Sequence, residues 1–189
     1  MRNVLIYPVG CTPASHAAGR ILAASGIAVT DHITPEATHL LMDVPSFSAE
    51  GVLKNGAQLD DLLPLLPQDI TLIGGNIPAA ISMQVPCMDL LKEETYLYEN
   101  AALTAECALR VAAEKMNFSF RGVPVLVIGW GRIGKQLCAL LICLGARVSL
   151  LSRTESHRAE AASFGITALS PQALPGQMRE FRLLLNTAP

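Results

Sequence analysis

The sequence predicts an α/β protein in which helices cover parallel sheets. Two features of the 189 residues predict this fold class. Short apolar runs of strand length alternate with amphipathic segments of helix length, which is the pattern of repeated βα units. One of these runs, 123–128, is rich in β-branched residues and carries no charge. Such a run is typical of a strand that is buried on both faces of a parallel sheet.

The apolar run 123–128 leads directly into the pattern Gly-x-Gly-x-x-Gly. Gly129 permits a tight turn, Gly131 lets the backbone approach a pyrophosphate, and Gly134 lets the following helix pack closely on the strand. The N-terminus of that helix offers N–H donors and a partial positive charge to an anion. The sequence therefore predicts that a nucleotide binds at Gly129, Trp130, Gly131, Arg132, Ile133 and Gly134.

The residues after this turn complete a βαβ unit. Apolar residues at helical spacing predict a helix over 133–144, which Gly145 ends. A second strand is predicted over 147–151, so the unit has the length of about 30 residues that a parallel crossover needs. This context favours a Rossmann dinucleotide-binding unit over a chance occurrence of the glycine pattern.

The segment after the strand 147–151 indicates which dinucleotide is bound. An NAD site normally places Asp or Glu here to bind the ribose 2′-hydroxyl. This chain has Ser152, Arg153 and Thr154 instead, with His157 and Arg158 one turn further on. A guanidinium binds a phosphate through paired hydrogen bonds, whereas a carboxylate would repel it. NADP(H) is therefore favoured over NAD(H), the alternative being that Arg153 is a solvated residue at a strand end.

The first part of the chain repeats the strand-and-helix pattern. Strands are predicted over 4–9, 27–30, 38–44 and 70–74, with a helix from Thr12 to about Ser25 and a short one around 59–66. We therefore predict a flavodoxin-like domain of four or five parallel strands over 1–97. A bridging helix, 99–116, and a linker are predicted within 98–120, and a Rossmann NAD(P)-binding domain, incomplete at its C-terminus, over 121–189.

About half of the chain, 98–189, resembles the A subunit of dipicolinate synthase. The resemblance lies in Y-E-N-A-A-L-T-A-E-C-A before the nucleotide strand, V-I-G-W-G-R-I-G at the phosphate turn, L-G-A-R-V-S-L-L-S-R-T-E-S-H at the second strand, F-G-I after the next helix, and N-T-A-P. That family is built like the D-2-hydroxyacid dehydrogenases and S-adenosylhomocysteine hydrolase. The resemblance implies a pyridine-nucleotide-dependent subunit that works with a flavoprotein-like second subunit. Together they would convert a dihydrodipicolinate-type dicarboxylate to dipicolinate, a metabolite of sporulation.

The resemblance also implies residues for the chemistry. Asn100 or Thr104 would hydrogen-bond the substrate or the nicotinamide in a cleft between the domains. Glu106 would exchange a proton if burial makes its carboxyl a weaker acid, the alternative being a solvated or ion-paired helix residue. Three residues near the end of the chain would join the cofactor site: Asn186, Thr187 and Pro189.

Composition and charge exclude several other classes. The net charge is −2, and the 14 Lys and Arg residues are scattered, so the sequence predicts neither a nucleic-acid surface nor a membrane-binding patch. Arg147 interrupts the most apolar stretch, 137–151, so no transmembrane run is predicted. The five cysteines form no Cys-x-x-Cys pair and have no His at zinc-ligand spacing. We expect a cytoplasmic protein without a metal site.

Two rival functions remain open, and the apolar composition adds an expectation about assembly. The first rival is a D-2-hydroxyacid or shikimate-type dehydrogenase, because Ser-Arg-Thr and Asn-Thr-x-Pro also occur in the shikimate group. The second is a non-catalytic nucleotide-binding or interaction module. Hydrophobic residues make up 51% of the chain, which predicts apolar surface at a contact. We expect a homo-oligomer, and we expect the isolated chain to bind nucleotide weakly and to show little turnover.

Overall fold

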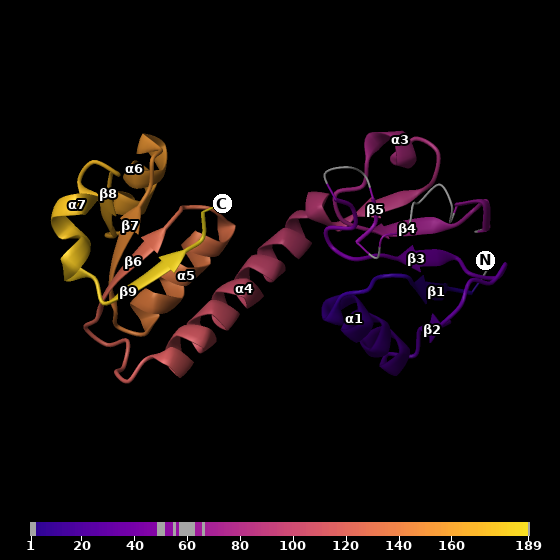
Figure 1. Ribbon diagram of the computed structural model, residues 1–189, viewed down its shortest axis with the longest axis horizontal. Coiled ribbons are helices and arrows are strands. Elements are labelled where there is room, and N and C mark those ends of the chain that lie inside the picture. The colour runs from indigo at the N-terminus through magenta and orange to yellow at the C-terminus, as the bar shows by residue number, and fades with distance from the viewer. Residues whose placement is uncertain (1–2, 49–51, 55, 57–62, 66, 189) are drawn as a thin grey trace. The chain divides into compact units, whose positions relative to one another are not determined.

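The computed structural model describes residues 3–48, 52–54, 56, 63–65 and 67–188. The chain divides into two compact units, Met1–Tyr96 and Leu97–Pro189, each with its own parallel sheet (Figure 1). Among the described residues, no helix has both the length and the apolar character needed to cross a membrane.

The first unit contains a five-stranded parallel sheet with the order β2-β1-β3-β4-β5. This order is that of a flavodoxin-like sheet and confirms the predicted fold class. Four strands lie within the predicted apolar runs, whereas the fifth has no separate prediction because its segment is short and polar at one end. The strands are β1 (Leu5–Pro8), β2 (Ala28–Val29), β3 (His39–Leu41), β4 (Thr71–Gly74) and β5 (Cys87–Asp89).

Helix α1 (Pro13–Ala24) begins and ends where the sequence predicts. The side chain of Thr12 caps it by accepting a hydrogen bond from the Ser15 amide, and Gly26 follows its end with a positive φ of 85°. The predicted helix around 59–66 appears only as the 3₁₀ turn η1 (Leu63–Leu65), and the rest of it lies outside the described residues. The remaining helical elements are α3 (Ala79–Ser82) and the 3₁₀ turn η2 (Leu90–Lys92).

A buried carboxylate closes the turn between β1 and α1. Asp43, which follows β3, is 4% exposed and accepts hydrogen bonds from the backbone amides of Cys11 (3.0 Å) and Thr12 (3.1 Å). Burial alone would raise the pKa of Asp43, but the hydrogen bonds from Thr12 and Cys11 outweigh it and hold the pKa well below its usual range. The amides at the start of α1 are therefore satisfied by the chain itself.

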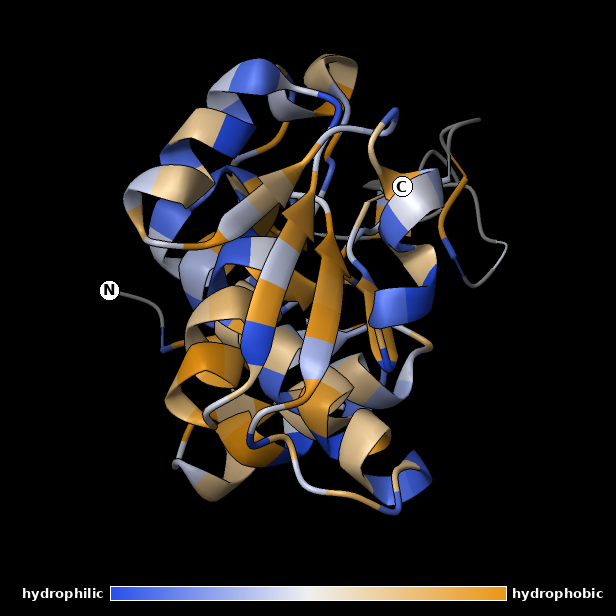
Figure 2. Cartoon of the chain, turned by 90° about the vertical axis from the view of Figure 1, so that its left-hand side faces the viewer, coloured by the Kyte–Doolittle hydropathy of each residue, from blue (hydrophilic) through white to orange (hydrophobic). Residues whose placement is uncertain are grey.

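The second unit contains a four-stranded parallel sheet with the order β8-β7-β6-β9. Counted within the unit this is 3-2-1-4, the arrangement at the centre of a Rossmann sheet. Figure 2 shows that these strands are apolar along most of their length. The strands are β6 (Pro124–Ile128), β7 (Arg147–Leu151), β8 (Thr167–Leu169) and β9 (Leu183–Asn186).

The helices from residue 94 onward lie close to the predicted ranges, and the largest shift is at the start of α4. Helix α5 (Arg132–Cys143) buries Leu137 and Leu141, and Gly145 follows it with a φ of 78°. Helix α4 (Glu94–Lys115) begins five residues before the predicted start at Glu99, because Glu94 supplies the acidic side chain that favours a helix N-terminus. The other helical elements are α6 (Glu155–Ser163), α7 (Leu174–Gln177) and the 3₁₀ turn η3 (Met178–Glu180).

We predict that Asp43→Asn destabilises the first unit by about 1–3 kcal/mol, because the amide group brings a donor against the Cys11 and Thr12 donors. Since the pKa of Asp43 is lowered by folding, its contribution is present above about pH 4 and is lost as the pH falls further. Thermal unfolding between pH 7 and pH 3 measures both effects. The control Asp31→Asn, at a side chain that is 98% exposed, should change stability by less than about 0.5 kcal/mol.

Candidate functional site

A cavity of about 700 Å³ lies at the carboxyl ends of the strands of the second unit. In open α/β sheets ligands bind at this edge, next to the point where the strand order reverses. That point is between β6 and β9 here, because β7 and β8 lie on one side of β6 and β9 on the other. The described lining consists of Ile128, Gly129, Trp130, Gly131, Leu151, Ser152, Arg153, Thr154, His157, Pro171, Asn186, Thr187 and Ala188.

The cavity brings together eight of the residues that the sequence proposes for the cofactor. They come from three loops that are far apart in the chain: Gly129, Trp130, Gly131, Ser152, Arg153, Thr154, Asn186 and Thr187. Arg132, Ile133 and Gly134 do not line it, because they form the first turn of α5. Pro189 lies outside the described residues.

Two of the three glycines are required by the packing of the turn itself. Gly129 has a φ of 101°, and a Cβ there would lie 2.8 Å from the hydroxyl oxygen of Thr187. A Cβ on Gly134 would overlap the carbonyl oxygen of Gly129. Helix α5 therefore approaches the end of β6 more closely than any side chain at 134 would allow.

Gly131 differs from the other two glycines. Its φ is −80°, which any residue adopts, and a Cβ at this position would have no other described atom within 4 Å. Gly131 is also the N-cap of α5, and no side chain of the described chain caps that helix. The fold therefore leaves open space against the backbone at the start of α5.

Thr187 holds the turn in place. Its amide and its hydroxyl each donate a hydrogen bond of 2.9 Å to the carbonyl oxygen of Ile128. The hydroxyl therefore stabilises the backbone of the turn, and the contact of Thr187 with a cofactor stays a prediction. Asn186 accepts a hydrogen bond from the Ala188 amide (3.1 Å), and its side chain lies at the cavity.

The loop after β7 is held by its own side chains and presents one guanidinium. The buried hydroxyl of Ser152 accepts a hydrogen bond from the Thr154 amide (3.3 Å). One nitrogen of Arg158 donates to the carbonyl oxygens of Ser152 and Arg153, both at 2.8 Å. Arg153 is exposed, and no ion pair joins it to another residue that the structure describes. No carboxylate belongs to the described lining of the cavity.

Several lining residues are absent from the sequence-based site. Ile128 and Leu151 end β6 and β7, so the carboxyl-edge rule would have found them. His157 is anticipated only as a neighbour of a phosphate. Pro171 follows β8 and reaches the cavity only because β8 pairs with β7, which a sequence pattern does not reveal.

The proposed catalytic residues lie on α4 and do not line this cavity. Asn100, Thr104 and Glu106 are all exposed. The hydroxyl of Thr104 donates to the carbonyl oxygen of Asn100 (2.6 Å), which is a bond to the preceding helical turn. Because Glu106 is exposed here, its proposed proton transfer would require burial by a bound substrate or partner, and it stays a prediction.

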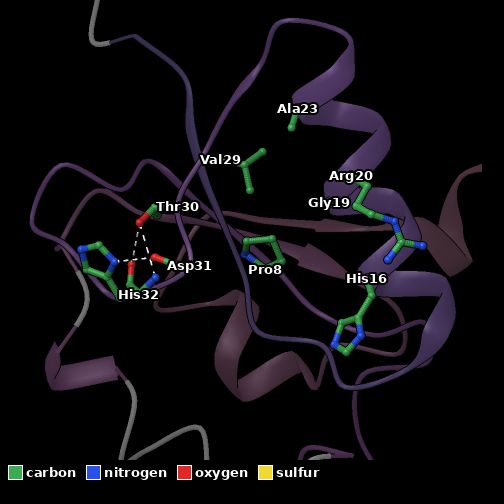
Figure 3. A pocket seen from close by; sticks show the side chains of 9 residues that line it. All are labelled: Pro8, His16, Gly19, Arg20, Ala23, Val29, Thr30, Asp31 and His32. Carbon is green, nitrogen blue, oxygen red and sulfur yellow. Dashed lines mark hydrogen bonds and ion pairs between the residues drawn. The ribbon is translucent and has the colours of Figure 1, made fainter.

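The first unit offers a different environment at the corresponding turn. There the amides of Cys11 and Thr12 already bind the carboxylate of Asp43, so a phosphate would meet a negative charge. A larger open cavity of about 810 Å³ lies between α1 and the residues after β2 (Figure 3). Its fixed charges, Arg20 and Asp31, cancel, and Asp31 pairs with His32 at 2.7 Å. Neither place resembles a phosphate site.

Among the described residues, no group of three or more His, Cys, Asp or Glu side chains could hold a metal ion.

Comparisons with curated proteins find two relatives that match parts of the chain. No family model matches the chain. The A subunit of dipicolinate synthase from Bacillus subtilis (strain 168) is 24% identical over 100 residues, which cover 53% of this chain and 34% of that protein. Glutamyl-tRNA reductase from Helicobacter hepaticus is 30% identical over 79 residues, which cover 40% of this chain and 18% of that protein. The chain thus spans about a third or less of the curated relatives that it matches.

Solved structures show the same similarity over the whole chain. The dipicolinate synthase A subunit from Bacillus halodurans superposes with a TM-score of 0.73 at 16% identity, over 100% of this chain and 75% of that one. The A subunit from Bacillus subtilis superposes with a TM-score of 0.71 at 17% identity, over 100% of this chain and 74% of that one. The resemblance to the A subunit of dipicolinate synthase is confirmed. A transhydrogenase from Sinorhizobium meliloti superposes with a TM-score of 0.65 at 16% identity, over 98% of this chain and 60% of that one. These superpositions confirm the Rossmann-like fold.

We predict opposite outcomes for alanine at two glycines of the turn. Gly134→Ala should destabilise the protein by about 1–3 kcal/mol, because its Cβ overlaps the Gly129 carbonyl oxygen. Gly131→Ala should stay within about 0.5 kcal/mol of the unmodified protein, because its Cβ enters open space. Urea unfolding measures both. Equal destabilisation by the two substitutions would contradict the distinction between the two glycines.

Proposed function

We propose that the second unit binds a pyridine dinucleotide, with NADP(H) preferred to NAD(H), and that the chain belongs to an oxidoreductase in the role of the dipicolinate synthase A subunit. The observation that carries this proposal is the open space at Gly131. At the start of a helix that follows a buried strand, a glycine that neither the backbone conformation nor the packing requires leaves room for a ligand to approach the backbone. A pyrophosphate at the N-terminus of α5 is that ligand.

The contrast between the two units supports the same assignment. Both units have a β-strand, a glycine-containing turn and a helix at the carboxyl edge of a parallel sheet. In the first unit an internal carboxylate, Asp43, occupies the helix N-terminus. In the second unit the corresponding space faces a cavity of about 700 Å³, a size within the range of cofactor sites.

The preference for NADP(H) rests on Arg153. Its guanidinium is exposed at the end of β7, next to the hydroxyls of Ser152 and Thr154, and the described lining holds no carboxylate. A 2′-phosphate at this position would gain a charge-assisted hydrogen bond. Because Arg158 fixes the carbonyl oxygens of this loop, little loop ordering would be needed on binding.

The chemistry proposed for the site is hydride transfer, which a bound nicotinamide supplies. The relatives are named as part of a synthase, as a reductase and as a transhydrogenase, which supports a nicotinamide-dependent oxidoreductase in general. We propose a dihydrodipicolinate-type dicarboxylate as substrate and a second, flavoprotein-like chain as partner. Asn100 or Thr104 would then hydrogen-bond the substrate or the nicotinamide. Glu106, which is exposed in this structure, would exchange a proton once the bound substrate and the partner chain bury it. Turnover of NADP⁺ with candidate dicarboxylates, with and without the partner chain, tests this assignment.

We predict that Gly131→Val abolishes nucleotide binding and leaves the protein folded. The valine side chain would fill the space against the α5 N-terminus, from which the pyrophosphate must then be excluded. Calorimetric titration with NADPH measures the loss, and circular dichroism measures the fold. Unchanged affinity in the folded variant would show that the glycine turn has another role.

We predict that Arg153→Glu weakens the binding of NADPH by about 1.5–3 kcal/mol and the binding of NADH much less. Only NADPH carries the 2′-phosphate that the guanidinium would contact. Dissociation constants for both cofactors measure the difference. The control Arg179→Glu makes the same charge change at an exposed residue that does not line the cavity. Equal weakening of both cofactors by Arg153→Glu would assign Arg153 to the solvated surface.

A further inference from the structure

Trp130 is anchored to a helix that lies 30 residues further along the chain. It stands between Gly129 and Gly131 in the phosphate turn, and its side chain is 5% exposed. The indole N–H donates a hydrogen bond of 2.9 Å to a carboxylate oxygen of Glu160, in α6. The ring of Phe164, from the residue after α6, lies 6.5 Å from the indole between ring centroids.

The other carboxylate oxygen of Glu160 binds a second element of the site. The Lys135 ammonium, in α5, donates to it at 2.6 Å and also lies 5.6 Å from the centre of the Trp130 ring. The hydrogen bond from Lys135, followed by that from Trp130, lowers the pKa of Glu160. The carboxylate is therefore ionised at neutral pH, with one oxygen on the turn and the other on α5.

Helix α6 also begins at the loop that carries Arg153. Its N-cap is Thr154, directly after Ser152 and Arg153. Glu160 thus connects α6, the helix that follows the loop after β7, to the phosphate turn and to the first half of α5. Its side chain is 43% exposed and Lys135 is 46% exposed, so a simple surface ion pair would contribute little to stability.

We propose that Glu160 is a positioning residue for the pyrophosphate of the dinucleotide, acting through the indole of Trp130. This inference rests on the proposed nucleotide site. Gly131 follows Trp130 directly, so the orientation of the indole fixes the backbone at the start of α5. An anchored turn presents its amides to the pyrophosphate without the entropy loss of ordering a mobile loop.

Two substitutions of Glu160 separate its hydrogen bond from its charge. Glu160→Leu removes the acceptor and should raise the Kd for NADPH about five- to tenfold, which corresponds to the loss of one hydrogen bond. Glu160→Gln keeps an acceptor oxygen for the indole and should stay within about twofold of the unmodified protein. In the leucine variant the Kd for NADH should rise by the same factor as the Kd for NADPH, because both nucleotides carry the pyrophosphate. The control Glu180→Gln, at an exposed residue of η3, should change neither Kd.

Trp130→Phe tests the same hydrogen bond from the side of its donor. It removes the indole N–H, should raise both Kd values as Glu160→Leu does, and should add nothing further in the double variant. Calorimetry measures each Kd on protein that circular dichroism shows to be folded. In the unmodified protein, the single indole N–H resonance should shift on addition of NADPH.

The outcomes separate this inference from the proposed function. If the unmodified protein binds neither NADPH nor NADH, the proposed function fails and this inference fails with it. If it binds both, and the folded Glu160→Leu and Trp130→Phe variants bind them equally well, only the positioning role is wrong. Binding by Glu160→Gln that is as weak as by Glu160→Leu would also overturn the role of the indole hydrogen bond.

Discussion

The close approach of α5 to the end of β6 is the constraint on which the rest of the second unit depends. The carbonyl oxygen of Gly129 occupies the space that a Cβ at 134 would need, and the Thr187 hydroxyl occupies the space beside Gly129. The Thr187 hydroxyl and amide in turn bind the carbonyl oxygen of Ile128. Because these contacts leave no room for a side chain at position 129 or 134, the turn is compact. Helix α5 therefore starts directly above the carboxyl edge of the sheet.

The two units use the same βα turn in different ways. In the first unit the amides at the start of α1 bind Asp43, and the carboxylate stabilises the turn from within. In the second unit the N-terminus of α5 faces a cavity, and a loop with one exposed guanidinium lies across from it. An internal anion closes the site in the first unit to phosphates. In the second unit no carboxylate belongs to the described lining of the cavity, which is consistent with an external anion there.

Much of the fold follows from sequence because local patterns determine it. The strand 147–151 appears with the predicted bounds, and Thr12 and Gly145 mark helix ends as their chemistry requires. The anchoring of Trp130 by Glu160 could not be predicted, since the partners are 30 residues apart and meet only when α6 packs beside the turn. Pro171 enters the cavity for a similar reason, because strand pairing rather than sequence spacing brings it there. The motif also does not reveal that the Thr187 hydroxyl, at the edge of the cavity, donates a hydrogen bond to the backbone of the turn.

The cavity at the carboxyl edge of β6, β7 and β9 is the proposed site of a pyridine dinucleotide. The chain has a single tryptophan, Trp130, and it lines this cavity. A titration that follows the emission of Trp130 on addition of NADPH therefore reports on the site itself, through quenching and energy transfer to the reduced nicotinamide. We predict saturable quenching by NADPH that NADH reproduces only at higher concentration. Emission that stays unchanged, or that falls without saturation for both nucleotides, would contradict it.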